Sequence, residues 1–196
     1  IYDEHVFIFS ASSVQKIFSK YNFELIDCKP QPTHGGSMRY VLARKDKWPI
    51  SSAVGNQLLY EDKIGLSLKS TYDSFRDKCE FSRAKLVELL EKQKDMGRRT
   101  VGYAATSKST TVLNYCKIGP SLVEYISDTT PIKQGKFSPG MHIPVRSYEV
   151  LHNGYPDCFL LFAWNHKAEV MEKEASFIES GGEWITYIPQ VDIIRK

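Results

Sequence analysis

The chain has 196 residues, a length that suits one large domain or one domain with part of another. Its 26 basic and 23 acidic residues leave a net charge of +3, which is too small and too dispersed to predict a nucleic-acid-binding surface. Aromatic residues are frequent, yet no apolar run approaches the roughly 20 residues that a membrane-spanning helix needs.

The cysteines lie far apart and contain no Cys-x-x-Cys pair, so we expect neither a zinc site nor a disulfide framework. We expect each to be a small buried hydrophobe in a reducing cytoplasmic compartment; they are Cys28, Cys79, Cys116 and Cys158. No signal peptide is evident. The chain begins at Ile1 instead of methionine, and we therefore expect a fragment of a larger protein whose N-terminal region has been removed.

The first 48 residues read as the end of an α/β domain whose beginning is absent. A polar cluster in residues 2–5 precedes a strand-like tail, and Ser10 or Ser12 is placed to cap a helix over residues 13–21. Strands are predicted over residues 23–29 and 38–44, joined by a turn that contains Gly35 and Gly36. Residues 49–70 are interpreted as a connector, within which Ser52 could cap a short helix.

The second domain is predicted over residues 71–196. A helix over residues 71–97 leads into a strand over residues 100–105, a polar loop, and a helix that starts near Val112. Such a loop and helix start offer donors to an anion. The dinucleotide fingerprint retains Gly102 but has Ala104 and Ser107 at its other glycine positions, so a plain strand–helix turn explains the stretch equally well.

The remaining elements complete a small open parallel sheet. A strand over residues 122–127 ends at Asp128, which a dinucleotide site would use for a ribose and which a capping role explains as well. A Pro- and Gly-rich loop over residues 131–145 leads to a helix near Tyr148, followed by a strand (158–164), a helix (166–180) and a strand (184–189). The strand from Cys158 to Trp164 reads as buried on both faces. We expect a Rossmann-like α/β fold with helices on both faces of the sheet.

One compact set of acid and base groups occurs, Tyr2-x-Glu4-His5. A carboxylate beside a histidine raises its pKa into the range useful for proton abstraction, and a tyrosine hydroxyl can hold an oxyanion. A surface turn is the structural alternative. His34 and Lys108 could contact a ligand, although a turn cap and an exposed lysine are the commoner outcomes. The other histidines have no metal-ligand spacing.

Several stretches together resemble the sugar C-methyltransferase family, in the same order and over nearly the whole chain. They are Tyr2-Asp-Glu-His5, Thr33-His-Gly-Gly-Ser-Met-Arg39, Gly102-Tyr-Ala-Ala with Lys108, Leu113-Asn-Tyr115, Pro131-Ile-Lys-Gln-Gly135, Pro139-Gly-Met-His-Ile-Pro144 and Ala163-Trp-Asn165. Asp3 departs from the histidine that is usual in the first motif. Ala104 and Ser109 stand where the family has glycine, which weakens a phosphate role for this loop.

The resemblance implies a three-part parent: a zinc-binding module, an S-adenosylmethionine-binding domain and a Rossmann-like C-terminal domain. Residues 1–48 would then be the end of the donor domain, and the fragment alone would be inactive. The family acts on nucleotide-linked 4-keto-deoxysugars. By resemblance, His5 is the base at C3, Glu4 orients it, Tyr2 steadies the enolate oxygen, and His34 and Lys108 contact the nucleotide diphosphate. The alternatives are a non-catalytic Rossmann-like module that binds a nucleotide sugar and, less favoured because of Ala104 and Ser107, a dehydrogenase-type domain.

Overall fold

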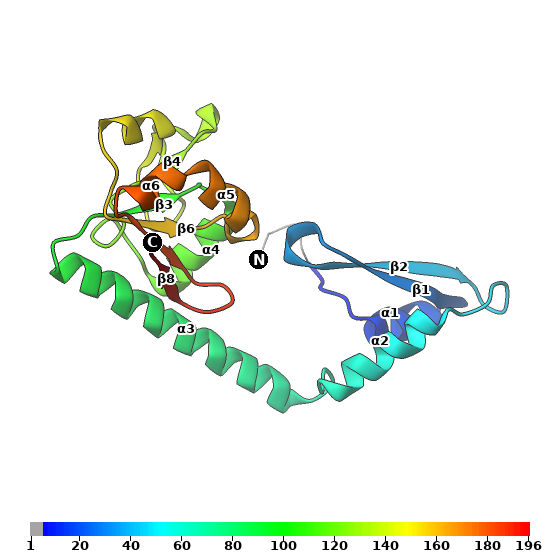
Figure 1. Ribbon diagram of the computed structural model, residues 1–196. Coiled ribbons are helices and arrows are strands. Elements are labelled where there is room, and N and C mark those ends of the chain that lie inside the picture. Colours follow the sequence, from blue (N-terminus) through cyan, green and yellow to red (C-terminus); the bar gives the residue numbers. More distant parts are fainter. Residues whose placement is uncertain (1–5) are drawn as a thin grey trace. The chain divides into compact units, whose positions relative to one another are not determined.

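The computed structural model describes residues 6–196, apart from the side chain of His34, and divides them into two compact units. The N-terminal unit extends to Asp77 and contains two antiparallel strands with two helices (Figure 1). Its elements are α1 (Ala11–Ser19), β1 (Phe23–Gln31), the 3₁₀ turn η1 (Thr33–Gly35), β2 (Ser37–Arg44), α2 (Ser52–Lys63) and the start of α3 (Lys69–Asp95). The predicted hairpin of two strands is therefore confirmed.

Capping side chains fix where the first two helices begin. Ser10 caps α1, because its hydroxyl accepts from the Ser13 amide while the Ser13 hydroxyl group accepts from the Ser10 amide. Ser51, one residue before the predicted cap, accepts from the Ala53 amide and starts α2. Glu61 of α2 accepts from the amides of Ala11 and Ser12 at 2.7 and 2.9 Å, which joins the two helices.

The core of the N-terminal unit is small. Its fully buried apolar side chains come from α1, β1 and α2; they are Ala11, Val14, Leu25, Cys28 and Val54. The segment that we expected to act as a connector, residues 49–70, thus contains α2 and part of this core. The division between the compact units falls after Asp77, within α3. The predicted domain boundaries, which separate residues 1–48, 49–70 and 71–196, stay a prediction.

The C-terminal unit, Lys78–Lys196, is built on a six-stranded sheet in the order β5-β4-β3-β6-β7-β8. All neighbouring strands are parallel except β7 and β8, and Gly102 of β3 pairs with Ile126 on one side and Leu160 on the other. The strands are β3 (Thr100–Tyr103), β4 (Ile126–Asp128), β5 (Val145–Ser147), β6 (Cys158–Leu161), β7 (Glu183–Thr186) and β8 (Asp192–Ile194). The Rossmann-like α/β prediction is confirmed.

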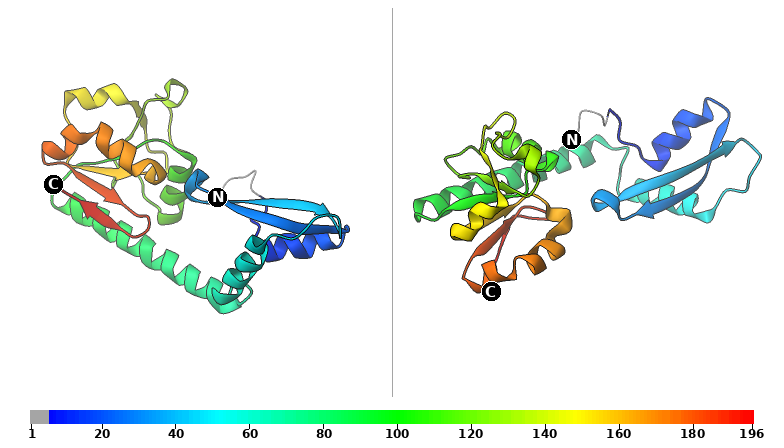
Figure 2. Two further views of the ribbon diagram at one scale, coloured as in Figure 1. Left: turned by 45° about the vertical axis from the view of Figure 1, so that its right-hand side comes forward. Right: turned by 90° about the horizontal axis from the view of Figure 1, so that it is seen from above.

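Helices cover both faces of this sheet, as the left view of Figure 2 shows for α3 on one side and the orange helices α5 and α6 on the other. The remaining helical elements are α4 (Ser107–Cys116), η2 (Pro131–Lys133), η3 (Tyr148–Asn153), η4 (Trp164–His166), α5 (Lys167–Lys173) and α6 (Ala175–Glu179). Leu90 of α3 and Leu113 of α4 pack against Leu160, whereas Phe177 of α6 packs with Phe159 and Trp184 on the opposite face.

Several local features differ from the sequence prediction, among them the strand expected over residues 122–127, which is the shorter β4 (Ile126–Asp128). The short strands β5 and β8 were not predicted, and the single helix expected over residues 166–180 is interrupted at Glu174. Of the four cysteines, Cys28 and Cys158 are buried as expected, while Cys79 and Cys116 are partly exposed. All four are free thiols.

Candidate functional site

The chain order of the strands reverses beside β3. After β3 the chain forms β4 and β5 on one side, and it then crosses to β6 on the other side of β3. In open parallel sheets the crevice outside the carboxyl ends of the strands at such a reversal is the usual ligand site. Here it lies after Tyr103 and Leu161, next to the segments 104–106 and 163–165.

The turn between β3 and α4 contains a backbone conformation that normally belongs to glycine. Ala104 has φ 70°, and its amide donates to the Ser127 carbonyl at 2.9 Å. Thr106 caps α4, because its hydroxyl accepts from the Ser109 amide at 3.1 Å. The turn is thus tight and closely bound to β4, even though it carries only the first of the three glycines of the dinucleotide fingerprint.

Lys108 is half-buried and lies in the first turn of α4, because the helix begins at Ser107 instead of near Val112. Its ammonium nitrogen is 5.9 Å from the centroid of the Trp164 ring, which follows β6. These two residues therefore come together across the reversal point of the sheet. The sequence predicts Trp164 at the end of a buried strand and within a motif, and its pattern gives no reason to pair Trp164 with Lys108; in the structure the strand ends at Leu161.

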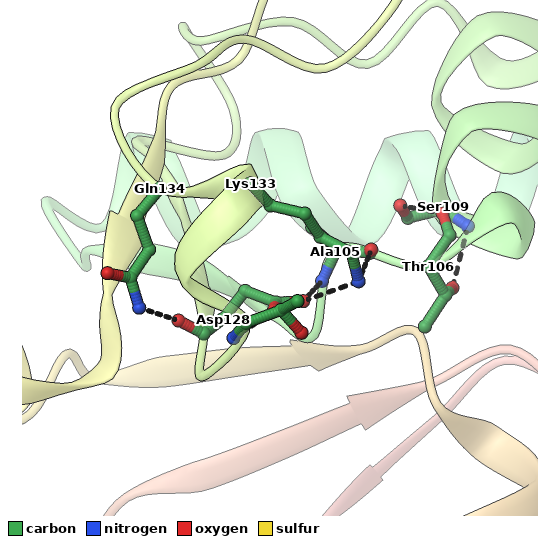
Figure 3. A network of polar contacts seen from close by, with 7 residues as sticks. Ala105, Thr106, Ser109, Asp128, Lys133 and Gln134 are labelled. Atoms are coloured by element: carbon green, nitrogen blue, oxygen red, sulfur yellow. Dashed lines mark hydrogen bonds and ion pairs between the residues drawn. The ribbon is translucent and has the colours of Figure 1, made fainter.

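Asp128, at the end of β4, holds the β3–α4 turn in place (Figure 3). Its Oδ2 accepts from the Ala105 amide at 2.7 Å and from Lys133 Nζ at 3.3 Å, and its Oδ1 accepts from the Thr130 amide at 2.7 Å. Lys133 Nζ also donates to the Ala105 carbonyl at 2.8 Å, and Gln134 Nε2 to the Asp128 carbonyl at 3.0 Å. We call this arrangement of residues 105, 128, 130, 133 and 134 the Asp128 network.

The electrostatics of Asp128 follow from these contacts. Burial raises the pKa of this carboxyl, but the hydrogen bonds from Thr130 and Ala105 and the charge of Lys133 outweigh burial and leave the pKa below its ordinary value. Both carboxylate oxygens already accept hydrogen bonds from the protein. Asp128 therefore has a structural role, because it binds backbone amides of the turns on either side, and a ribose hydroxyl would have to compete with these hydrogen bonds.

A second buried carboxylate lies on the other face of the sheet. Glu174 accepts from the hydroxyls of Tyr103 and Tyr148, each at 2.7 Å, and is 1% exposed. Burial, reinforced by the hydrogen bond to Glu174, raises the pKa of both tyrosines. Both tyrosines therefore stay protonated and donate to the Glu174 carboxylate. These hydrogen bonds hold the break between α5 and α6 beside the carboxyl end of β3.

The predicted catalytic residues Tyr2, Glu4 and His5 lie outside the described residues, and so does the side chain of His34. The backbone of His34 belongs to η1 in the N-terminal unit. These assignments stay predictions. Within residues 6–196, no group of three or more His, Cys, Asp or Glu side chains could hold a metal ion. The zinc implied by the resemblance was expected in another module, and nothing in the described chain supports it.

Two of the motif stretches meet at the carboxyl end of the parallel strands, and two others meet beside α4. Lys133, from the stretch 131–135, bonds to the turn at Ala105. Asn114, from the stretch 113–115, donates to the Pro139 carbonyl at 2.9 Å and thereby joins α4 to the stretch 139–144. Residues far apart in the sequence are thus brought together, but the stretch 139–144 leads into Val145 at the start of β5 and so lies toward the amino end of the strands. No helix in the described part of the chain combines the length and apolar character that crossing a bilayer requires.

The chain is similar to known proteins. A family described as the C-methyltransferase C-terminal domain matches residues 32–189. The chain is also similar to the C-methyltransferase NovU of Streptomyces niveus, with 34% identity over 195 residues, which are 99% of this chain and 46% of NovU. The chain therefore spans about half the length of that relative.

Proposed function

Since this chain belongs to the C-methyltransferase family and carries the family's C-terminal domain, we propose that it is the acceptor-binding part of a sugar C-methyltransferase. The acceptor would be a nucleotide-linked 4-keto-deoxysugar and the methyl donor S-adenosylmethionine. The observation that carries the proposal is the family match over residues 32–189, which includes every stretch that meets at the sheet edge. A non-catalytic nucleotide-sugar-binding module is the alternative, and it would bind the sugar without turnover.

The proposed reaction forms a carbon–carbon bond next to a ketone. His5 takes the proton from C3, and the electrons of the C–H bond spread onto the ketone oxygen as an enolate. The Tyr2 hydroxyl donates a hydrogen bond to that oxygen, and Glu4 orients the imidazole and favours its protonated form. When bound, S-adenosylmethionine would supply the electrophilic methyl group to which C3 of the enolate bonds, and the electrons of the broken C–S bond would remain on sulfur.

The donor site is assigned to another part of the full-length protein. The β3–α4 turn has Ala104 and Ser107 at two of the glycine positions, and Asp128 is occupied by the Asp128 network, so the turn does not suit an adenosyl group. We accordingly expect the 196-residue chain alone to show no methyl transfer. The C-terminal unit would help to hold the nucleotide diphosphate of the acceptor, and contacts of Lys108 and His34 with it stay predictions.

The test is the substitution His5→Ala in the full-length protein, with His152→Ala, an exposed histidine, as the matched control. We expect His5→Ala to abolish methyl transfer and to leave binding of S-adenosylmethionine nearly unchanged, because the residue acts on the acceptor. The control should retain activity. Normal turnover by His5→Ala would remove His5 from the role of base.

A further inference from the structure

A cavity of about 290 Å³ lies between the first half of α4 and the segment 131–145 of the C-terminal unit. Pockets that enclose a whole small-molecule ligand have volumes of roughly 300–1,000 Å³. This cavity is at the lower limit of that range, so it suits one part of a ligand and not an entire nucleotide sugar. The β3–α4 turn forms its inner end through Ala105 and Thr106.

The walls of the cavity are held by hydrogen bonds. The Val145 amide donates to the Lys136 carbonyl and the Ser138 amide to the Ile143 carbonyl, both at 2.8 Å, so residues 135–145 form an irregular hairpin. The buried Ser138 hydroxyl accepts from the Ile143 amide at 3.0 Å. Asn114 joins the tip of this hairpin to α4 through the Pro139 carbonyl. The cavity is therefore present without a ligand.

The hairpin side of the cavity is apolar. Phe137, Pro139 and Val145 line it, with Ile132 from η2. Phe137 is 62% exposed and Ile132 73% exposed, so an aromatic ring and a branched aliphatic chain remain in water at the rim. A flat ring that stacks on Phe137 would remove this apolar surface from water.

The charge of the cavity is positive. Two lysines line it and no acidic residue does. The Lys133 ammonium is engaged by Asp128 and the Ala105 carbonyl, whereas Lys136 is exposed and takes part in none of the ion pairs found within residues 6–196. Lys136 is therefore free to meet an anionic group of a ligand at the rim.

We propose that this cavity binds the base of a nucleoside diphosphate, with the base against Phe137 and the phosphates next to Lys136. The inference rests on the proposed function, because it assigns a place to the nucleotide of the acceptor. It adds two residues, Phe137 and Lys136, to which the sequence motifs assign no role.

The experiment measures binding to the 196-residue chain by isothermal titration calorimetry, with uridine diphosphate, adenosine diphosphate, uridine and inorganic pyrophosphate as probes. We expect Phe137→Ala to weaken the binding of a nucleoside diphosphate and of the free nucleoside by about tenfold, and to leave the binding of pyrophosphate unchanged. Lys136→Gln should weaken the binding of the nucleoside diphosphate and of pyrophosphate, and it should leave the binding of the free nucleoside unchanged. Comparing uridine and adenosine diphosphate gives the preferred size of base.

The matched controls are Phe81→Ala and Lys92→Gln, which remove an exposed aromatic ring and an exposed lysine from α3. They should bind every probe as the unmodified chain does. Both rim residues are exposed, so folding of their variants is expected and is checked by thermal denaturation. Absence of nucleoside diphosphate binding, or equal binding by rim variants and controls, would overturn the inference. Methyl transfer by the full-length protein is measured separately, so a failure of the proposed function would be distinguished from a failure of the cavity.

Discussion

At the scale of single residues, Ala104 is the clearest departure from what its side chain prefers. Its φ of 70° costs an alanine about 1–2 kcal/mol relative to the ordinary conformations. This position is also where the dinucleotide fingerprint places its second glycine. The sequence shows that this glycine is missing, but the energetic cost of an alanine at this position can be judged only from the backbone angle.

We predict that Ala104→Gly stabilises the chain by about 0.5–1 kcal/mol, because relief of the left-handed strain exceeds the added entropy of the unfolded chain. The free energy of unfolding from urea titration measures this difference. Ala105→Gly is the control, because Ala105 is not among the residues of positive φ, and it should be destabilising. A less stable Ala104→Gly variant would show that the turn does not store this strain.

The Asp128 carboxyl makes the stability of the chain depend on pH. Since its pKa is lower in the folded than in the unfolded protein, its contribution to stability is present above its unfolded pKa and is lost as the pH falls through the folded pKa. Asp128→Asn should destabilise the chain by about 1–3 kcal/mol at neutral pH. The difference from the unmodified chain should shrink between about pH 5 and about pH 3.

Denaturant titrations across this pH range measure the effect, with Lys133→Met as the companion variant that removes only the cation of the Asp128 network. Lys133→Met should show a weaker pH dependence than the unmodified chain, because its aspartate has lost one source of the lowered pKa. If the free energies of unfolding of Asp128→Asn and of the unmodified chain differ by the same amount down to about pH 3, the Asp128 network as described is contradicted.

At the scale of elements, the sequence predicted most helices and strands because their periodicity is strong. The helix over residues 71–97 and the strand from Cys158 are examples, and the first corresponds to α3 (Lys69–Asp95). β5 and β8 have three residues each, too few for an alternating pattern to be recognised. The break at Glu174 was not predictable either, because its partners Tyr103 and Tyr148 are distant in the sequence.

The hairpin of residues 135–145 depends on a glycine at its tip. Gly140 has φ 81°, and a β-carbon there would overlap the side-chain amide of Asn114, which holds the Pro139 carbonyl. We predict that Gly140→Ala destabilises the chain and weakens nucleoside diphosphate binding, because Asn114 must move away from the hairpin. Gly135→Ala is the control for strain alone, because Gly135 has φ 74° and no atom within 4 Å of the added carbon.

Thermal denaturation and calorimetric titration of both variants separate the two effects. Gly140→Ala should lose more stability than Gly135→Ala and should bind the diphosphate more weakly. Equal losses in the two variants would mean that contact between Asn114 and the hairpin has no part in holding the cavity.

At the scale of the whole molecule, the two units differ in how much apolar surface they bury. The N-terminal unit has five fully buried apolar residues, and most of the large exposed apolar side chains of the described chain belong to it, including Phe7, Trp48 and Leu59. A two-stranded sheet with so small a core is marginally stable in water.

Hydrogen exchange tests this difference between the units. In the 196-residue chain, the amides of β1 and β2 should exchange faster than those of the central strands β3 and β6, whose side chains are fully buried. The measurement is exchange followed by mass spectrometry of peptides. Equal protection of the two units would contradict a marginal N-terminal unit.

The activity itself could be predicted from the sequence only through the resemblance. The motif stretches indicated the family, and the match over residues 32–189 confirms that the chain belongs to the C-methyltransferases. The Asp128 network and the pairing of Lys108 with Trp164 could not be predicted, because each joins residues whose proximity depends on the order of the strands.

The central proposal is that the protein containing this chain methylates a carbon next to a ketone through an enolate. The most direct measurement follows the full-length enzyme in deuterated water with S-adenosylmethionine and a nucleotide-linked 4-keto-deoxysugar. Mass spectrometry and NMR then locate both deuterium and methyl group. We predict deuterium at C3 of recovered substrate when the donor is withheld, and a new C3–methyl bond when it is present. A methyl group on oxygen or nitrogen, with no exchange at C3, would contradict the account.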